Sequence, residues 1–79
     1  MVEMIKIKSY NFKKIGYDKE KKILIIEWIS GIKCKYFEIP EKYYIYLLQH
    51  NSPGSFMHRF IKNKFKWETI FETDEYLIN

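Results

Sequence analysis

Cysteine, glycine, proline and long aliphatic runs are all scarce in this chain of 79 residues. Its one cysteine, Cys34, excludes a disulfide framework and a cysteine-based zinc site, and is typical of a reducing compartment. Three glycines and two prolines are too few for a collagen-like or low-complexity protein. The longest aliphatic run, Ile23-Leu24-Ile25-Ile26, is far shorter than the ~20 residues of a membrane helix. The N-terminus also lacks the apolar stretch of a signal peptide. The sequence therefore predicts a cytoplasmic protein that contacts no membrane.

Aromatic and charged residues are abundant instead. Apolar residues make up 47% of the chain and charged residues 30%, a composition typical of a globular domain. The aromatic residues are seven Tyr, six Phe and two Trp. A domain this small buries only about 60% of the surface that its unfolded chain exposes, so we expect these rings to supply much of the core.

Charge is distributed unevenly along the chain. Residues 1–67 hold all 14 Lys and Arg but only six acids, which gives +8, whereas residues 68–79 hold four acids and no base. We therefore expect one domain over residues 1–67, followed by an acidic C-terminal extension over residues 68–79. A basic body favours an anionic partner through long-range attraction. The alternative is that the lysines serve only solubility.

Hydrophobic periodicity predicts an α+β fold, in which a three-stranded antiparallel β-meander is followed by two short α-helices packed on one sheet face. The first strand begins near Ile5 and runs to Asp18, the second covers residues 23–29, and the third follows the Ser30-Gly31 turn over residues 32–39. The first helix begins at Pro40 and packs through Tyr43, Tyr44, Leu47 and Leu48. The second helix is capped by Ser55, and its predicted inward residues are Phe56, Phe60, Met57 and Ile61.

Three motifs follow one another along these elements. They are Ile15-Gly16-Tyr17-Asp18, then Ser30-Gly31 with Tyr36-Phe37 and Ile39-Pro40, and finally Ser52-Pro53-Gly54-Ser55-Phe56-Met57-His58. In this order and spacing they resemble the KTSC domain, a small domain found at the C-terminus of some lysyl-tRNA synthetases and as free-standing proteins. The resemblance covers residues 7–67 and implies the family's small fold and, from the synthetase context, RNA binding. Two positions differ from the family pattern: Cys34 replaces a tyrosine, and His58 replaces an asparagine.

Basic residues in two places are candidates for nucleic-acid binding. On the third strand, Lys33 and Lys35 project from one face, while Cys34 and Tyr36 project from the other. The lysines are expected to meet phosphates, and Tyr36 either stacks on an unpaired base or packs in the core. On the second helix, a positive stripe at helical spacing suits a phosphate backbone, or is an ordinary solvated face; it consists of His58, Arg59, Lys62, Lys64 and Lys66.

The turn before the second helix is a candidate anion-binding site. Ser52, Gly54 and Ser55 are placed to present N–H groups to an anion such as a phosphate, although a simple turn with a helix cap explains the same residues. The sequence indicates no set of catalytic residues, no metal site and no cofactor.

These observations favour a small non-enzymatic module that binds nucleic acid, RNA in preference to duplex DNA. The alternative is a protein-interaction or inhibitor module that acts through its aromatic surface or its acidic tail. The sequence does not indicate an oligomeric state.

Overall fold

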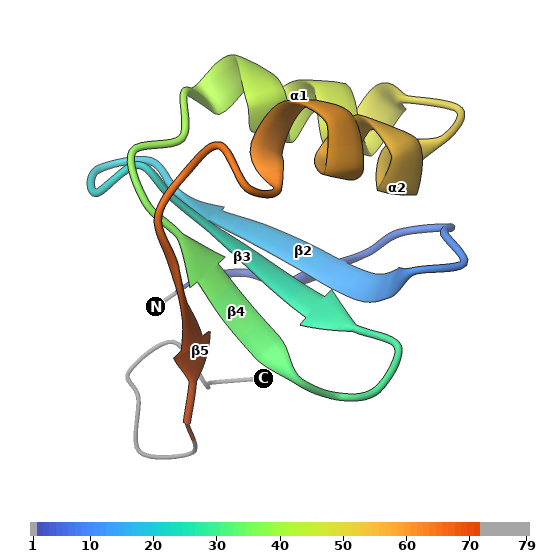
Figure 1. The fold of residues 1–79 in the computed structure, drawn as a ribbon, viewed down its shortest axis with the longest axis horizontal. Coiled ribbons are helices and arrows are strands. Elements are labelled where there is room, and N and C mark those ends of the chain that lie inside the picture. The colour runs from blue at the N-terminus through green and yellow to red at the C-terminus, as the bar shows by residue number, and fades with distance from the viewer. Residues whose placement is uncertain (1, 72–79) are drawn as a thin grey trace.

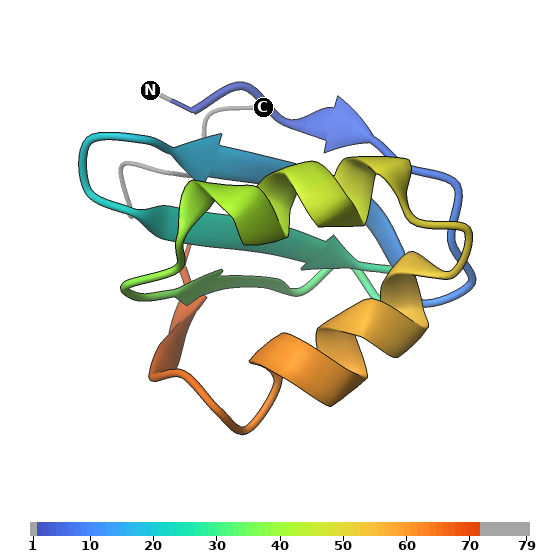
Figure 2. The same cartoon turned by 90° about the horizontal axis from the view of Figure 1, so that it is seen from above.

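The computed structural model describes residues 2–71, and these residues form a five-stranded antiparallel sheet with its helices on one face (Figures 1 and 2). The strands lie side by side in chain order, β1-β2-β3-β4-β5. The elements are β1 (Ile5–Lys6), β2 (Phe12–Asp18), β3 (Ile23–Trp28), β4 (Lys33–Tyr36), α1 (Glu41–Gln49), α2 (Pro53–Phe56), the π-helix η1 (Met57–Ile61) and β5 (Trp67–Ile70). The α+β class and the pair of helices agree with the sequence analysis, but the prediction of three strands was wrong.

One additional strand arises because the predicted first strand is two strands. The chain turns back near Tyr10, so that β1 pairs with β2 in the register Ile5↔Ile15. The turn is closed by a backbone hydrogen bond from the Ile7 N–H to the Lys13 carbonyl (3.0 Å) and by the Asn11 N–H, which donates to Ser9 Oγ (3.1 Å). The alternation of apolar and polar residues marks both strands, but it does not show the reversal between them.

The other additional strand, β5, lies beyond the predicted helices. It pairs antiparallel with β4, and Tyr36 lies opposite Trp67. β5 spans the boundary that the sequence analysis placed between residues 67 and 68, so residues 68–70 of the acidic extension form part of the sheet. Residues 72–79 of that extension, including the tail residues proposed to dock a partner, lie outside the described residues.

Turns and helix starts follow the local chemistry of proline and glycine. Gly31 adopts φ +97° in the β3–β4 turn, which confirms the predicted Ser30-Gly31 reversal. Pro40 precedes α1 as its N-cap residue. The second helix begins earlier than predicted, because Pro53 occupies its first turn and Ser52, not Ser55, is the N-cap residue.

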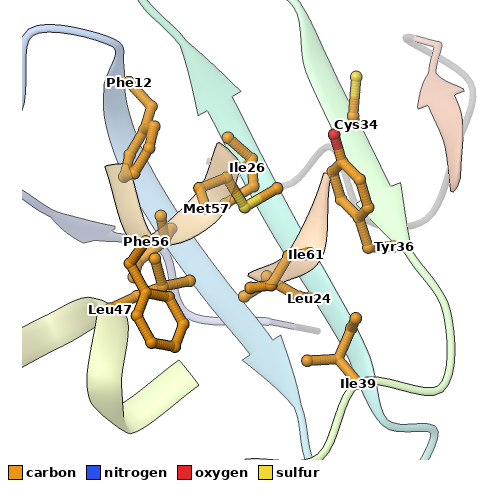
Figure 3. Packing of buried hydrophobic residues seen from close by; sticks show 11 residues of the cluster. Phe12, Leu24, Ile26, Cys34, Tyr36, Ile39, Leu47, Phe56, Met57 and Ile61 are labelled. Carbon is orange, nitrogen blue, oxygen red and sulfur yellow. The ribbon is translucent and has the colours of Figure 1, made fainter. Parts of the chain in front are cut away.

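The main core lies between the sheet and the helices (Figure 3). Leu24 and Ile26 point toward the helices and belong to the same buried cluster as Leu47 of α1. Two predicted inward residues, Leu48 of α1 and Phe60 of η1, are instead 39% and 43% exposed. The buried members of the cluster are Phe12, Ile15, Leu24, Ile26, Cys34, Tyr36, Ile39, Leu47, Phe56, Met57 and Ile61.

A smaller apolar cluster covers part of the opposite sheet face. It contains Ile23, Ile25 and Ile70, and Val2 packs over them from the N-terminal segment. That segment passes close to Gly16, where a Cβ atom would lie 2.8 Å from the Glu3 carbonyl oxygen. Glycine is therefore required at this position for the chain to cross the sheet.

The Ile15-Gly16-Tyr17-Asp18 motif has a structural explanation throughout. Ile15 is fully buried, and Gly16 accommodates the N-terminal segment. The Tyr17 hydroxyl donates to the Ile39 carbonyl (2.5 Å), and its ring stacks on Tyr44 of α1 at 5.4 Å. Asp18 accepts a hydrogen bond from a backbone N–H in the β2–β3 turn (3.1 Å). These contacts join the sheet to α1.

Candidate nucleic-acid interface

The π-helix η1 presents three consecutive side chains to solvent. Met57 and Ile61 are buried at its two ends, and between them His58, Arg59 and Phe60 are exposed. The Lys62 N–H closes the wide turn by donating to the Met57 carbonyl (2.8 Å). Single π-turns of this kind occur frequently at functional sites. A ring and a guanidinium group therefore lie next to each other on the surface.

The cations of this region form a row that carries no compensating acid. Arg59, Lys62, Lys64 and Lys66, together with His58, are all exposed, and we call them the cationic row. The sequence contains no acidic residue from Lys42 to Trp67. Within residues 2–71, no carboxylate forms an ion pair with a lysine or arginine of the row. Among the described residues, no ion pair therefore neutralises the positive charge of the row.

The next acid along the chain does not neutralise the row, because it projects from the other side of the sheet. Glu68 lies opposite Lys35 in the β4–β5 ladder, whereas the neighbouring Trp67 lies opposite Tyr36 on the helix side. Since successive side chains of a strand alternate between faces, Glu68 points away from the helices.

Exposed aromatic rings lie beside the cationic row. Phe56 is buried, and its ring contacts the half-exposed rings of Phe60 and Tyr46 at centroid distances of 4.9 and 5.7 Å. His50 contacts the same ring at 5.5 Å. The Arg59 guanidinium carbon lies 5.8 Å from the Phe60 centroid, within cation–π range. We call Phe60 and Tyr46, with Phe56 beneath them, the aromatic platform.

Sequence reasoning missed this platform. It assigned Phe60 to the core and gave Tyr46 no role. The inward positions are filled by Phe56, Met57 and Ile61, and the π-turn leaves Phe60 outside. A π-turn has no recognised sequence signature, but the excess of aromatic residues over what one helix face can bury was a usable signal.

Trp28 marks the border of the interface at the end of β3. The Lys62 ammonium lies 5.9 Å from the centroid of the Trp28 ring. The Phe12 ring packs edge-on against the same Trp28 ring, with a centroid distance of 5.8 Å. Trp28 is only partly buried. The contact holds one cation of the row above the sheet end.

The strand and helix groups of basic residues lie on opposite sides of the sheet. Cys34 and Tyr36 face the helices, so Lys33 and Lys35 project from the opposite sheet face. Tyr36 is only 2% exposed and cannot stack on a base; of the two alternatives, the core interpretation is confirmed. Burial, with a smaller contribution from the nearby Cys34 thiol, raises the pKa of Tyr36 to about 12. The two groups of basic residues therefore do not form one continuous surface.

The predicted anion-binding turn lies beside the cationic row, and its conformation is held by contacts of Ser52, Pro53 and Gly54. Pro53 is buried, and a Cβ atom on Gly54 would collide with the Asn11 side-chain amide. The Ser52 N–H donates to His50 Nδ1 (2.9 Å). Ser52 and Ser55 are exposed, and both line two adjoining hollows of about 480 and 610 Å³.

The described residues contain no group of three or more His, Cys, Asp or Glu side chains that could hold a metal ion. None of their helices has the length and apolar character to span a membrane.

Burial raises the pKa of two further tyrosines, Tyr17 and Tyr44, and nearby carboxylates add a smaller contribution in the same direction.

Comparisons with known proteins agree with the resemblance seen in the sequence. The sequence profile of the KTSC domain family matches residues 8–65. The crystal structure of a KTSC domain protein from Yersinia pestis is similar in fold, with a TM-score of 0.86 and 25% sequence identity over 90% of this chain and 100% of that chain. No curated protein matches the chain in sequence.

Proposed function

For this chain, which belongs to the KTSC domain family, we propose that the helix side of the domain binds single-stranded nucleic acid, RNA in preference to duplex DNA. The observation that carries the proposal is the exposed Phe60 ring beside the Arg59 guanidinium on η1. The module acts by binding rather than by catalysis, and it does so in the cytoplasm.

The cationic row supplies the attraction to phosphates. Four permanently charged side chains follow within eight residues, from Arg59 to Lys66, and the Arg59 guanidinium is suited to bidentate phosphate contacts. Binding by such a row releases condensed counterions, so affinity falls steeply as salt rises. Phosphate contacts carry no sequence information, and the proposed binding is accordingly tolerant of sequence.

The aromatic platform supplies the preference for single strands. Exposed rings stack on unpaired bases, and each such contact contributes ~1–3 kcal/mol. In a duplex the base faces are covered by their neighbours, so Phe60 and Tyr46 have nothing to stack on. The platform lies beside Arg59, which allows one nucleotide to contact a ring and a cation together.

A charge-matched pair of variants tests this proposal. Arg59→Gln/Lys62→Gln removes two cations from the helix side, and Lys33→Gln/Lys35→Gln removes two from the opposite sheet face. Binding of a fluorescent single-stranded RNA of mixed sequence is measured by anisotropy at low salt, with duplex DNA of the same sequence as the comparison. The helix-side variant is expected to weaken RNA binding about tenfold or more, since a charge-assisted hydrogen bond contributes ~1.5–3 kcal/mol.

The control variant is expected to change affinity by less than about threefold, because Lys33 and Lys35 project from the far sheet face and charges separated by more than ~10 Å are largely screened. No RNA binding by the unmodified protein at low salt would refute the proposal. Equal losses in the two variants would show that only net charge matters. A stoichiometric protein partner that survives nuclease treatment, in the absence of RNA binding, would favour the protein-interaction alternative.

A further inference from the structure

The two hollows beside the second helix meet at the turn before it. Both are lined by Asn11, Ser52, Gly54 and Ser55. One continues to Lys8, His50 and the exposed loop at Tyr10, and the other continues to Trp28, His58 and Lys62. We call the second of these the serine hollow. It opens directly onto the cationic row, because His58 and Lys62 belong to both.

The lining of the serine hollow is rich in hydrogen-bond donors and contains no acid. Besides the Trp28 indole, its polar side chains are two hydroxyls, one amide, one imidazole and one ammonium group, from Ser52, Ser55, Asn11, His58 and Lys62. The adjoining hollow contains no Asp or Glu either. A site of this composition repels no anion and offers few ligands to a hard cation, which prefers carboxylate and carbonyl oxygens. Its chemistry fits an anion with several acceptor oxygens.

Packing holds the lining in place. The Asn11 carbonyl accepts from the Ile29 N–H (3.2 Å), and the Asn11 N–H donates to Ser9 Oγ (3.1 Å). The Asn11 side chain lies against Gly54, where any Cβ atom would displace it. These contacts, on both sides of Asn11, fix the first loop against the turn between the helices.

We propose that the serine hollow binds a terminal phosphomonoester, the 5′- or 3′-phosphate at the end of an RNA strand that lies along the cationic row or the phosphate of a free mononucleotide. The first of these sources rests on the proposed function. A phosphomonoester carries about −1.5 to −2 charges at neutral pH and three terminal acceptor oxygens. An internal phosphodiester carries one charge and two such oxygens. The density of donors in the hollow matches the monoester better, whereas the rest of the row presents one cation at a time.

The position of the hollow also favours an end over an internal phosphate. His58 and Lys62 connect it to the row, and the Asn11 loop and the Ser52–Gly54 turn line it on other sides. An RNA strand that follows the cationic row from Lys66 toward Lys62 meets the Asn11 loop and the Ser52–Gly54 turn at the serine hollow. The serine hollow therefore suits the terminal phosphate of the RNA, which carries more negative charge than an internal phosphate.

Four ligands test the inference: RNA oligonucleotides of one sequence with a 5′-phosphate, with a 3′-phosphate or with hydroxyls at both ends, and adenosine 5′-monophosphate. Affinities come from anisotropy with an internal label, and the mononucleotide is assayed by thermal stabilisation of the protein. One phosphorylated oligonucleotide is expected to bind about tenfold more tightly than the hydroxyl-ended one, a difference equivalent to about 1.4 kcal/mol.

Two variants locate the effect. Ser52→Ala/Ser55→Ala is expected to abolish the preference for a phosphorylated end, and Arg59→Gln is expected to weaken all oligonucleotides while keeping that preference. Stabilisation by the mononucleotide that disappears in the serine variant supports binding of the free nucleotide at the same place. Equal binding of the three oligonucleotides, with no stabilisation by the mononucleotide, overturns the inference but leaves the proposed function intact. Failure of every oligonucleotide to bind refutes the proposed function instead.

Discussion

The salt dependence of RNA binding gives a quantitative test of the cationic row. Arg59, Lys62, Lys64 and Lys66 are exposed and form no ion pair within residues 2–71. If all four neutralise phosphates of a single strand, log K falls with log salt at a slope of about −0.7 for each cation, or about −2.8 in total. Raising salt from about 50 to about 200 mM then weakens binding about 50-fold.

Replacing three of these cations predicts a defined change. In the variant Arg59→Gln/Lys62→Gln/Lys64→Gln only Lys66 remains, so the slope is expected to fall to about −0.7, and the same salt increase should weaken binding only about threefold. The assay is anisotropy of a labelled single-stranded RNA over a series of salt concentrations. Thermal unfolding of each variant shows whether the fold is retained.

A matched variant on the opposite sheet face provides the control. Lys14 and Lys33 flank Glu27 in the ladder, and Lys35 projects from the same side. Lys14→Gln/Lys33→Gln/Lys35→Gln removes the same formal charge and is expected to leave the slope near −2.8. Equal slopes for the two triple variants would refute the assignment of binding to the helix side.

Three further predictions concern single residues. Phe60→Ala should weaken RNA binding by ~1–3 kcal/mol per stacked base without changing the salt slope; an altered slope would contradict a stacking role. The raised pKa of Tyr36, about 12 in the folded protein against about 10 unfolded, means that the folded state retains this proton longer. Its contribution to stability is complete below pH about 10 and declines toward pH about 12 by about 2.7 kcal/mol; urea denaturation of Tyr36→Phe should lack this part of the alkaline decline. Gly16→Ala should destabilise the domain by about 1–3 kcal/mol, because its Cβ would lie within 3 Å of the N-terminal segment, and deletion of residues 2–4 should remove most of that effect.

Local patterns explain why much of the fold could be predicted. The alternation in β3 assigns Leu24 and Ile26 to one sheet face and Ile23 and Ile25 to the other, and the structure divides them in the same way. Gly31 produces the predicted reversal because only its backbone tolerates φ +97° without strain. Each of these features depends on residues that are close together in the chain.

The features that could not be predicted depend on distant partners. β5 has four residues, and it is a strand because β4 offers a free edge after the helices have returned the chain to the sheet. Phe60 is exposed because the π-turn displaces it from a core that other side chains fill. The candidate site was located in part: the sequence named the helix cations and separated Lys33 and Lys35 from Tyr36, but the alternation of side chains did not show which sheet face the helices cover.

Amide chemical-shift mapping of the protein with single-stranded RNA tests the central claim most directly. Binding to the helix side predicts that the largest changes occur at residues 58–66 and at Tyr46, with little change at Lys33 and Lys35. Changes concentrated on β4 and the opposite sheet face, or no changes on addition of RNA at low salt, would contradict the account.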